Sequence, residues 1–159
     1  MGRQRGFTLP EMLVVVAIIG IIAAFGSPAM SRLLTTQAVR AASYDLYADL
    51  IYARSEAIAR GTTVSVTAVS GTNWKGGWTI VENAGNTLLR EQSGRTSAID
   101  FTSSQPAVTF DRNGRANTAG PMTFNIVPDA TMYSPEPNMK RCIRLDASGR
   151  PKSTEGSCP

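Results

Sequence analysis

A run of basic side chains near the C-terminal end is the first place where this sequence could do chemistry. Five positive charges fall within 13 residues, against a single acid at Asp146, and they belong to Lys140, Arg141, Arg144, Arg150 and Lys152. Guanidinium and ammonium groups bind phosphate, and such contacts weaken as salt is added. Positive charge on an exposed edge strand also prevents that strand from pairing with the strands of other molecules. The cluster therefore predicts either a phosphate-binding surface or a solvated edge hairpin, and on a strand Arg141 and Arg144 would face opposite sides.

A carboxylate at the head of an apolar segment is the second chemical feature. Glu11 is followed by 14 residues, 12–25, that carry no charge and no hydrogen-bonding side chain, and Arg3 and Arg5 precede it. A helix of about 20 residues spans the hydrocarbon core of a bilayer. The basic residues predict a cytoplasmic N-terminus and export of the rest of the chain. A cleaved signal peptide or a plain signal anchor has no use for Glu11, because a carboxylate is costly in a membrane.

The residues that are missing exclude much catalytic chemistry. The chain of 159 residues has no histidine and two cysteines, so a Ser-His-Asp triad, a Cys-His dyad and a four-thiolate metal site are impossible within it. Asp45 and Asp49 have no neighbouring base and are interpreted as the solvated face of a helix. The sequence predicts no catalytic residue, no metal and no cofactor, and therefore not an enzyme. The net charge of +4 permits nucleic acid or anionic lipid as a partner without requiring either.

Two kinds of periodicity predict the elements that carry these residues. A helix is expected over 7–60, ending before Gly61 and kinked at Pro28, and its second half has one apolar face made of Val39, Ala42, Leu46, Leu50, Ala53 and Ala57. After it the period changes to two. Strands are expected at 62–69, 78–82, 88–91, 98–101, 107–111, 122–127 and 141–146, with a turn at 73–78. The fold class is α+β, with the long helix packed on a C-terminal antiparallel sheet.

The N-terminal segment Gly6-Phe7-Thr8-Leu9-Pro10-Glu11 resembles the signal of type IV pilins and pseudopilins. The resemblance implies that a prepilin peptidase cuts after Gly6, that Phe7 is N-methylated, and that Glu11 is the fifth residue of the mature chain. It also matches Pro28 with a family proline, whereas Pro10 departs from the usual Leu or Ile. In a filament the new amine of Phe7 would pair with Glu11 of a neighbouring subunit, which relieves two costly charges. The alternative is that Glu11 reaches the membrane surface.

The segments 110–115, 140–146 and 148–150 are similar to the FimT/FimU minor pilins and the GspH-type pseudopilins. The resemblance implies a leader at 1–6, a transmembrane or filament-core helix at 7–30, an amphipathic half at 31–60 and a β-rich globular part at 61–159. The expected function is that of a minor type IV pilin in pilus assembly or initiation, at or near the tip. The alternative is a pseudopilin of a type II secretion system.

The same resemblance implies the partners and the location of the chain. The expected partners are other major and minor pilins, the prepilin peptidase, the inner-membrane assembly platform, and the lipid bilayer before assembly. The chain would cross the inner membrane once, with its C-terminal domain in the periplasm, and later reach the pilus at the cell surface.

The two cysteines and the tail add two further expectations. Cys142 and Cys158 would pair in an oxidising periplasm, and the alternative is two free thiols. The residues Gly149-Arg150-Pro151-Lys152 resemble the Gly-Arg-x-Arg tail of FimT-type proteins that bind DNA for natural transformation, with lysine in place of the second arginine. The resemblance implies DNA as a possible partner. A solvated hairpin and a contact with a neighbouring pilin remain the alternatives for these charges.

Overall fold

The computed structural model describes residues 7–94, 98–118, 120–130 and 136–159, and within the helix it leaves out the side chains of 24–29. The chain forms two compact units, Met1–Leu34 and Thr35–Pro159. One helix, α1 (Leu9–Arg60), contributes to both. The remaining elements are β1 (Val64–Ser70), β2 (Asn73–Glu82), β3 (Thr87–Ser93), β4 (Ile99–Ser103), β5 (Ala107–Phe110), β6 (Ala116–Asn117), β7 (Met122–Pro128), the short 3-10 helix η1 (Pro137–Met139), β8 (Arg141–Leu145) and β9 (Pro151–Glu155).

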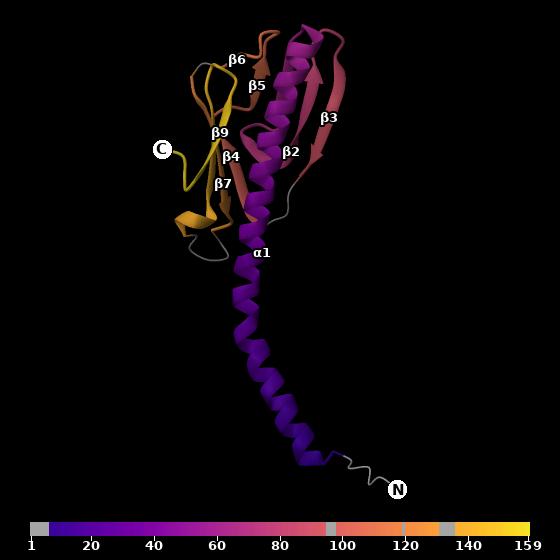
Figure 1. The fold of residues 1–159 in the computed structure, drawn as a ribbon, viewed down its shortest axis with the longest axis vertical. Coiled ribbons are helices and arrows are strands. Elements are labelled where there is room, and N and C mark those ends of the chain that lie inside the picture. Colours follow the sequence, from indigo (N-terminus) through magenta and orange to yellow (C-terminus); the bar gives the residue numbers. More distant parts are fainter. Residues whose placement is uncertain (1–6, 95–97, 119, 131–135) are drawn as a thin grey trace. The chain divides into compact units, whose positions relative to one another are not determined.

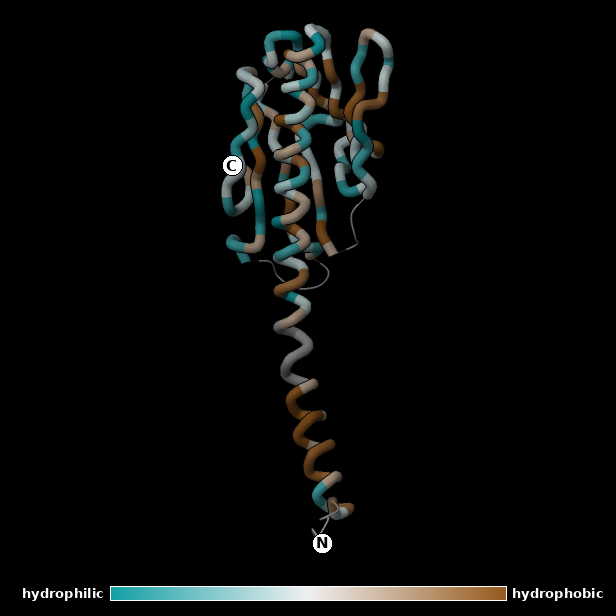
Figure 2. Tube along the Cα trace, turned by 45° about the vertical axis from the view of Figure 1, so that its right-hand side comes forward, coloured by the Kyte–Doolittle hydropathy of each residue, from teal (hydrophilic) through white to brown (hydrophobic). Residues whose placement is uncertain are grey.

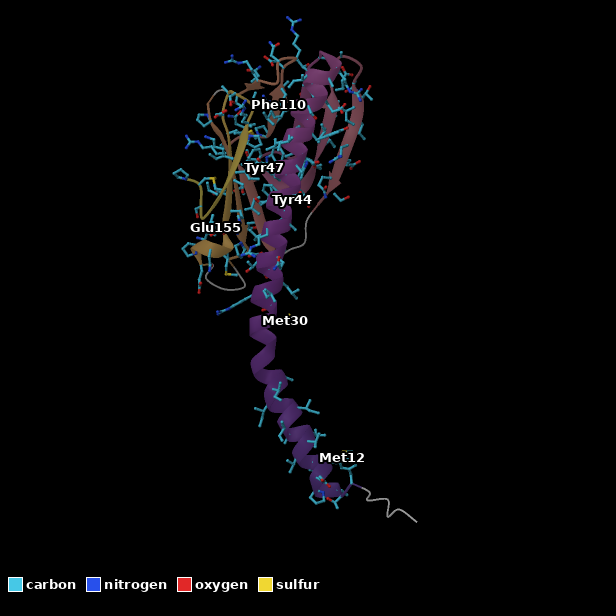
Figure 3. All side chains as sticks on the ribbon, in the orientation of Figure 1. Met12, Met30, Tyr44, Tyr47, Phe110 and Glu155 are labelled. Carbon is cyan, nitrogen blue, oxygen red and sulfur yellow. A yellow bond between two sulfur atoms is a disulfide. The ribbon has the colours of Figure 1, made fainter. Side chains whose placement is uncertain are left out.

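The first unit is the N-terminal part of α1, and its described surface is strongly apolar. Figure 2 shows a hydrophobic segment between the start of α1 and the residues drawn in grey. Its large apolar side chains are exposed, as Figure 3 shows for Met12. No helix in the described part of the chain is both long and apolar enough to cross a membrane. The kink expected at Pro28 lies outside the residues whose side chains the structure describes.

The second unit is held together by α1 packed on one face of the sheet (Figure 1). The helix buries every residue of the face predicted from spacing, and these are Val39, Ala42, Leu46, Leu50, Ala53 and Ala57. Gly61 ends the helix with a φ of +64°. The Gly61 and Thr62 amides donate to the carbonyls of Ile58 and Ala57 at 3.3 and 3.2 Å, which is a Schellman cap.

All paired strands of the sheet are antiparallel, as expected. The order is β6-β5-β1-β2-β4-β7-β8-β9, and β3 pairs with β2 beside this path. β2 meets β4 only at Asn73 and Thr102, because its second half turns to pair with β3. The buried core extends from Val39 to Leu145 within Thr35–Pro159. This unit therefore has a complete core of its own and is expected to fold without the first.

The turn predicted at 73–78 is wrong, because these residues belong to strand β2. The chain instead turns one step earlier, at Gly71, whose φ is +55°. Trp74 and Trp78 are fully buried, and their rings pack edge-on against Phe124 and Phe101 at 4.9 and 5.7 Å between centroids. Burial of two indoles outweighs the turn preference of the glycines between them.

Candidate functional site

Glu11 lies in the first turn of α1, as the sequence predicts, and it also has a local partner. Its Oε2 lies 3.4 Å from both the backbone N and the Oγ1 of Thr8, which donate to it. Threonine followed three residues later by glutamate is the capping-box pattern, in which the carboxylate satisfies a free amide at the helix start. Glu11 therefore has a structural role within its own subunit that the sequence analysis missed, although the pattern was visible. Gly6 lies outside the described residues, and Phe7 is exposed.

The five basic residues of the tail do not form one surface. Arg141 lies on the same side of β8 as the buried Ile143, and its guanidinium pairs with Glu155 on β9 at 2.8 Å. Figure 3 labels Glu155 on this strand. Lys140 is half-buried at the end of η1. The expected alternation of Arg141 and Arg144 is confirmed, and one of the five charges is neutralised within the fold.

Arg144 and Lys152 are the two tail charges that share a face. They stand directly opposite each other across β8 and β9, and both are exposed. With Cys142 and Thr154 they line a hollow that also contains Asp146. A hydrogen bond from the Ser148 hydroxyl lowers the pKa of Asp146, and the charge of Lys152 lowers it further. The carboxylate therefore stays ionised and reduces the positive charge of this face.

Arg150 belongs to a different surface, at the turn that precedes β9. There it lines a pocket with Arg54 from α1 and Arg115 from the turn before β6. Arg54 and Arg115 were not predicted as part of this surface, because they are far from the tail in the chain. The sequence does contain one sign that Arg115 and Arg150 are related. Both end the same pattern, Asp-x-x-Gly-Arg, at 111–115 and 146–150.

The prediction that Asp49 lies on a solvated helix face is wrong. Its side chain is 4% exposed and accepts hydrogen bonds from Trp78 Nε1 at 2.9 Å and Arg90 Nη1 at 2.6 Å. The position follows Leu46 by three residues and so lies at the edge of the apolar face, where β2 and β3 cover it. These contacts make Asp49 structural.

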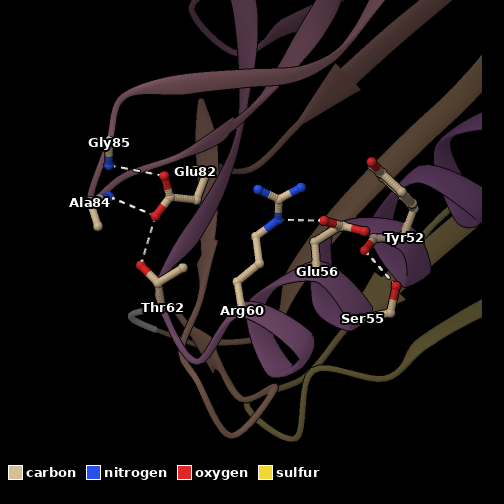
Figure 4. A network of polar contacts seen from close by, with 8 residues as sticks. All are labelled: Tyr52, Ser55, Glu56, Arg60, Thr62, Glu82, Ala84 and Gly85. Atoms are coloured by element: carbon tan, nitrogen blue, oxygen red, sulfur yellow. Dashed lines mark hydrogen bonds and ion pairs between the residues drawn. The ribbon is translucent and has the colours of Figure 1, made fainter.

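A second buried carboxylate, Glu82, joins the end of α1 to the β2–β3 turn (Figure 4). It accepts hydrogen bonds from Thr62 Oγ1 at 3.0 Å and from the Ala84 and Gly85 amides at 3.1 and 2.9 Å. The Gly85 amide is the main cause that lowers the pKa of Glu82 below its ordinary value. Beside this network Arg60 pairs with Glu56 at 2.6 Å, as the sequence spacing predicts.

Cys142 and Cys158 form a disulfide, so the predicted pairing is confirmed. The bond fastens the end of the chain to β8. The backbone amide of Cys158 also donates to Asn125 Oδ1 on β7 at 2.8 Å. The last residues are therefore held across two strands, although they bury little apolar surface.

Comparison with known proteins supports the pilin-like architecture. Residues 42–149 match the family described as type II transport protein GspH, and residues 1–27 match the prokaryotic N-terminal methylation motif. The type IV minor pilin FimU of Pseudomonas aeruginosa strain PAO1 has a similar structure, with a TM-score of 0.62, 24% identity, and coverage of 76% of this chain and 99% of FimU. The minor pseudopilin EpsH of the Vibrio cholerae type 2 secretion system has a TM-score of 0.50 and 16% identity, covering 75% of this chain and 96% of EpsH. No curated protein sequence matches the chain.

The family match covers well over half of the chain, and the methylation motif covers the segment that contains Gly6, Phe7 and Glu11. The matched family is described as a type II transport protein and not as an enzyme, in agreement with the expectation that the chain is not an enzyme. The chain therefore belongs to the GspH family and is a pilin-like protein of the minor pilin and pseudopilin class.

Proposed function

We propose that the chain is a minor type IV pilin that is built into a pilus, at or near its tip, and takes part in starting pilus assembly. One observation carries this proposal. The apolar side chains along the start of α1 are exposed, from Leu9 at 76% to Ile22 at 66%, and Glu11 is the single carboxylate among them. An apolar surface of this extent requires a covering of lipid or of other apolar helices.

Lipid would cover this surface before assembly, and the helices of other subunits would cover it in the filament. Before assembly the helix would lie in the inner membrane, with a cytoplasmic N-terminus and a periplasmic sheet domain. A prepilin peptidase would cut after Gly6 and leave a methylated amine at Phe7. In the filament, the helices of neighbouring major and minor pilins replace the lipid, and the Phe7 amine pairs with Glu11 of another subunit. The inner-membrane assembly platform would carry out the transfer.

The test is complementation of a deletion strain with single variants. Gly6→Val blocks cleavage, and Glu11→Gln removes the assembly charge while keeping nearly the same shape. We expect both to abolish incorporation into sheared pili, whereas the control Glu91→Gln, an exposed carboxylate on β3, leaves incorporation intact. Normal pili from the Gly6 variant would contradict the proposal. Normal pili from the deletion strain together with lost secretion of exported enzymes would favour a type II secretion pseudopilin.

A second candidate function, DNA binding for uptake, is favoured by the exposed pair of Arg144 and Lys152 on one face of β8 and β9. A mobility-shift measurement on the unit from Thr35 onward at two salt concentrations tests it. The double variant Arg144→Gln/Lys152→Gln would lose binding, and the control Arg112→Gln, which removes an exposed charge elsewhere on the same unit, would retain it. Absence of a shift at low salt excludes DNA binding and leaves the assembly function unaffected.

A further inference from the structure

Two turns of the same sequence pattern lie next to each other in the second unit. The segments 111–115 and 146–150 both have the sequence Asp-x-x-Gly-Arg. In each turn the aspartate Oδ1 accepts a hydrogen bond from the backbone amide two residues later, at 2.8 Å for Asn113 and 2.9 Å for Ser148. The glycine amide of each donates to the aspartate carbonyl, and both glycines have a φ of +74°. The two turns thus present their final arginines from the same local geometry.

The turns pack on each other and on α1 through their glycines. A Cβ added to Gly149 would overlap the carbonyl oxygen of Gly114, and one added to Gly114 would lie 2.6 Å from Ile58 Cδ1. Arg54 Nε, on the helix, donates to the Gly114 carbonyl at 2.9 Å. The backbones of the two turns are therefore in direct contact, and the helix packs on them through the side chains of Ile58 and Arg54, which holds Arg54 at the junction.

This junction forms a pocket of about 350 Å³ lined by Arg54, Asn113, Arg115, Ser148 and Arg150. Three guanidinium groups and one amide supply its side-chain donors, the Ser148 hydroxyl donates to Asp146, and no carboxylate lines the pocket. Arg115 and Arg150 are exposed and form no ion pair within the described part of the chain. The Asp111 and Asp146 carboxylates accept backbone hydrogen bonds within their own turns and line the neighbouring hollows.

The composition of the pocket selects its ligand. Three positive charges and no carboxylate line the pocket, so an anion is favoured over a cation or a neutral molecule. A guanidinium offers parallel donors that match two oxygens of a phosphate or a carboxylate. A phosphate group has more oxygens than a carboxylate and so presents acceptors to three arginines at once. No aromatic side chain lines the pocket, which leaves no platform for a stacked base.

We propose that Arg54, Arg115 and Arg150 form a binding site for a phosphate group. The site does not depend on the pilus function or on the Arg144 and Lys152 face. The arginines would recognise a free phosphate and a phosphate of a nucleic acid strand by the same chemistry. Arg54 is fixed by its hydrogen bond to the Gly114 carbonyl, and the two turn arginines line the same pocket.

The test is an NMR titration of the unit Thr35–Pro159 with inorganic phosphate, with sodium chloride at equal ionic strength as the reference. We expect saturable shifts of the amides of 113–115 and 148–150 that chloride does not reproduce. Arg115→Gln should weaken phosphate binding about 10-fold, the amount expected for one charge-assisted contact. The control Arg112→Gln removes an exposed charge from the same turn, outside the pocket, and should change binding less than about twofold.

Arg150→Gln is a second variant of the pocket. Unfolding curves of the Arg115, Arg150 and Arg112 variants confirm that each is folded. Equal phosphate affinity in the Arg115 and Arg112 variants would overturn the proposal, as would tighter binding of an acidic peptide than of phosphate. A short single-stranded oligonucleotide that competes for the same amides would identify nucleic acid as a source of the phosphate. Phosphate binding without such competition would identify a small phosphate compound. Loss of pilus assembly in these variants is not expected, so failure here is separable from failure of the assembly proposal.

Discussion

Asp49 on α1 and Arg90 on β3 form an ion pair that fastens an edge strand to the helix, with 2.6 Å between Oδ1 and Nη1. The other carboxylate oxygen accepts the indole N–H of Trp78. The Arg90 guanidinium also lies over the Tyr52 ring, 4.3 Å from its centroid. Because β3 pairs only with β2 and its own side chains are mostly exposed, this cluster is its main connection to the helix.

Replacement of Asp49 by alanine should lower the free energy of unfolding by about 2–4 kcal/mol, because it leaves a buried indole N–H without an acceptor and Arg90 without its charge partner. Arg90→Gln should cost only about 1 kcal/mol or less, since that side chain is 47% exposed and its charge is screened by water. Urea unfolding of Thr35–Pro159 measures both. Equal losses in the two variants would contradict the assignment of Asp49 as the anchoring group.

The disulfide should contribute about 3 kcal/mol to stability, as expected for a closed loop of this length. The loop gains little from apolar burial, because β9 exposes four of its five residues. We expect Cys142→Ser/Cys158→Ser to lower the urea midpoint without a change in the core. A matched measurement on the wild-type unit with added reductant should give the same shift. An unchanged midpoint would show that hydrogen bonds such as the one from Cys158 to Asn125 hold the tail unaided.

Gly149→Ala should destabilise the second unit, because the added Cβ overlaps the Gly114 carbonyl and the backbone has a positive φ. The expected loss is about 1–3 kcal/mol, the range for a strained backbone position. Gly120→Ala is the control, since a Cβ there meets nothing within 4 Å. Thermal unfolding of the two variants gives the comparison, and similar melting temperatures would argue against tight contact between the turns.

The parts of the fold that follow a local period could be predicted from the sequence. The buried face of α1 follows 3- and 4-residue spacing, and the structure buries every predicted member from Val39 to Ala57. The helix end at Gly61 follows from the one residue type that adopts its backbone angles at no cost. The signal around Glu11 is local as well, and the matched methylation motif covers it.

The parts that the periodicity does not show could not be predicted in the same way. β9 has a polar sequence with no alternation, and it becomes a strand because it forms a hairpin with the preceding β8. Asp49 has the composition of a solvated helix position, and its burial depends on strands that come much later in the chain. Arg54, Arg115 and Arg150 come from three distant segments, so their shared pocket exists only in the folded chain.

The ionisation of Glu82 should make the free energy of unfolding depend on pH. Its carboxylate accepts three hydrogen bonds that require the ionised form, and they hold its folded pKa below the pKa in the unfolded chain. Such a group stabilises the fold fully above the unfolded pKa of about 4.3, and the contribution disappears as the pH falls through the lower folded value. The free energy of unfolding should therefore fall with decreasing pH below about 4.3.

Glu82→Gln isolates this effect, because glutamine keeps the size of the side chain but does not titrate. In urea unfolding at a series of pH values, the difference in stability between wild type and this variant should be constant near neutral pH and shrink below about pH 4.3. Glu91→Gln, at an exposed position on β3, should show no comparable convergence. A difference that stays constant down to the lowest measurable pH would mean that the three donors do not depend on the charge of Glu82. Convergence would show that the charged carboxylate joins the end of α1 to the β2–β3 turn.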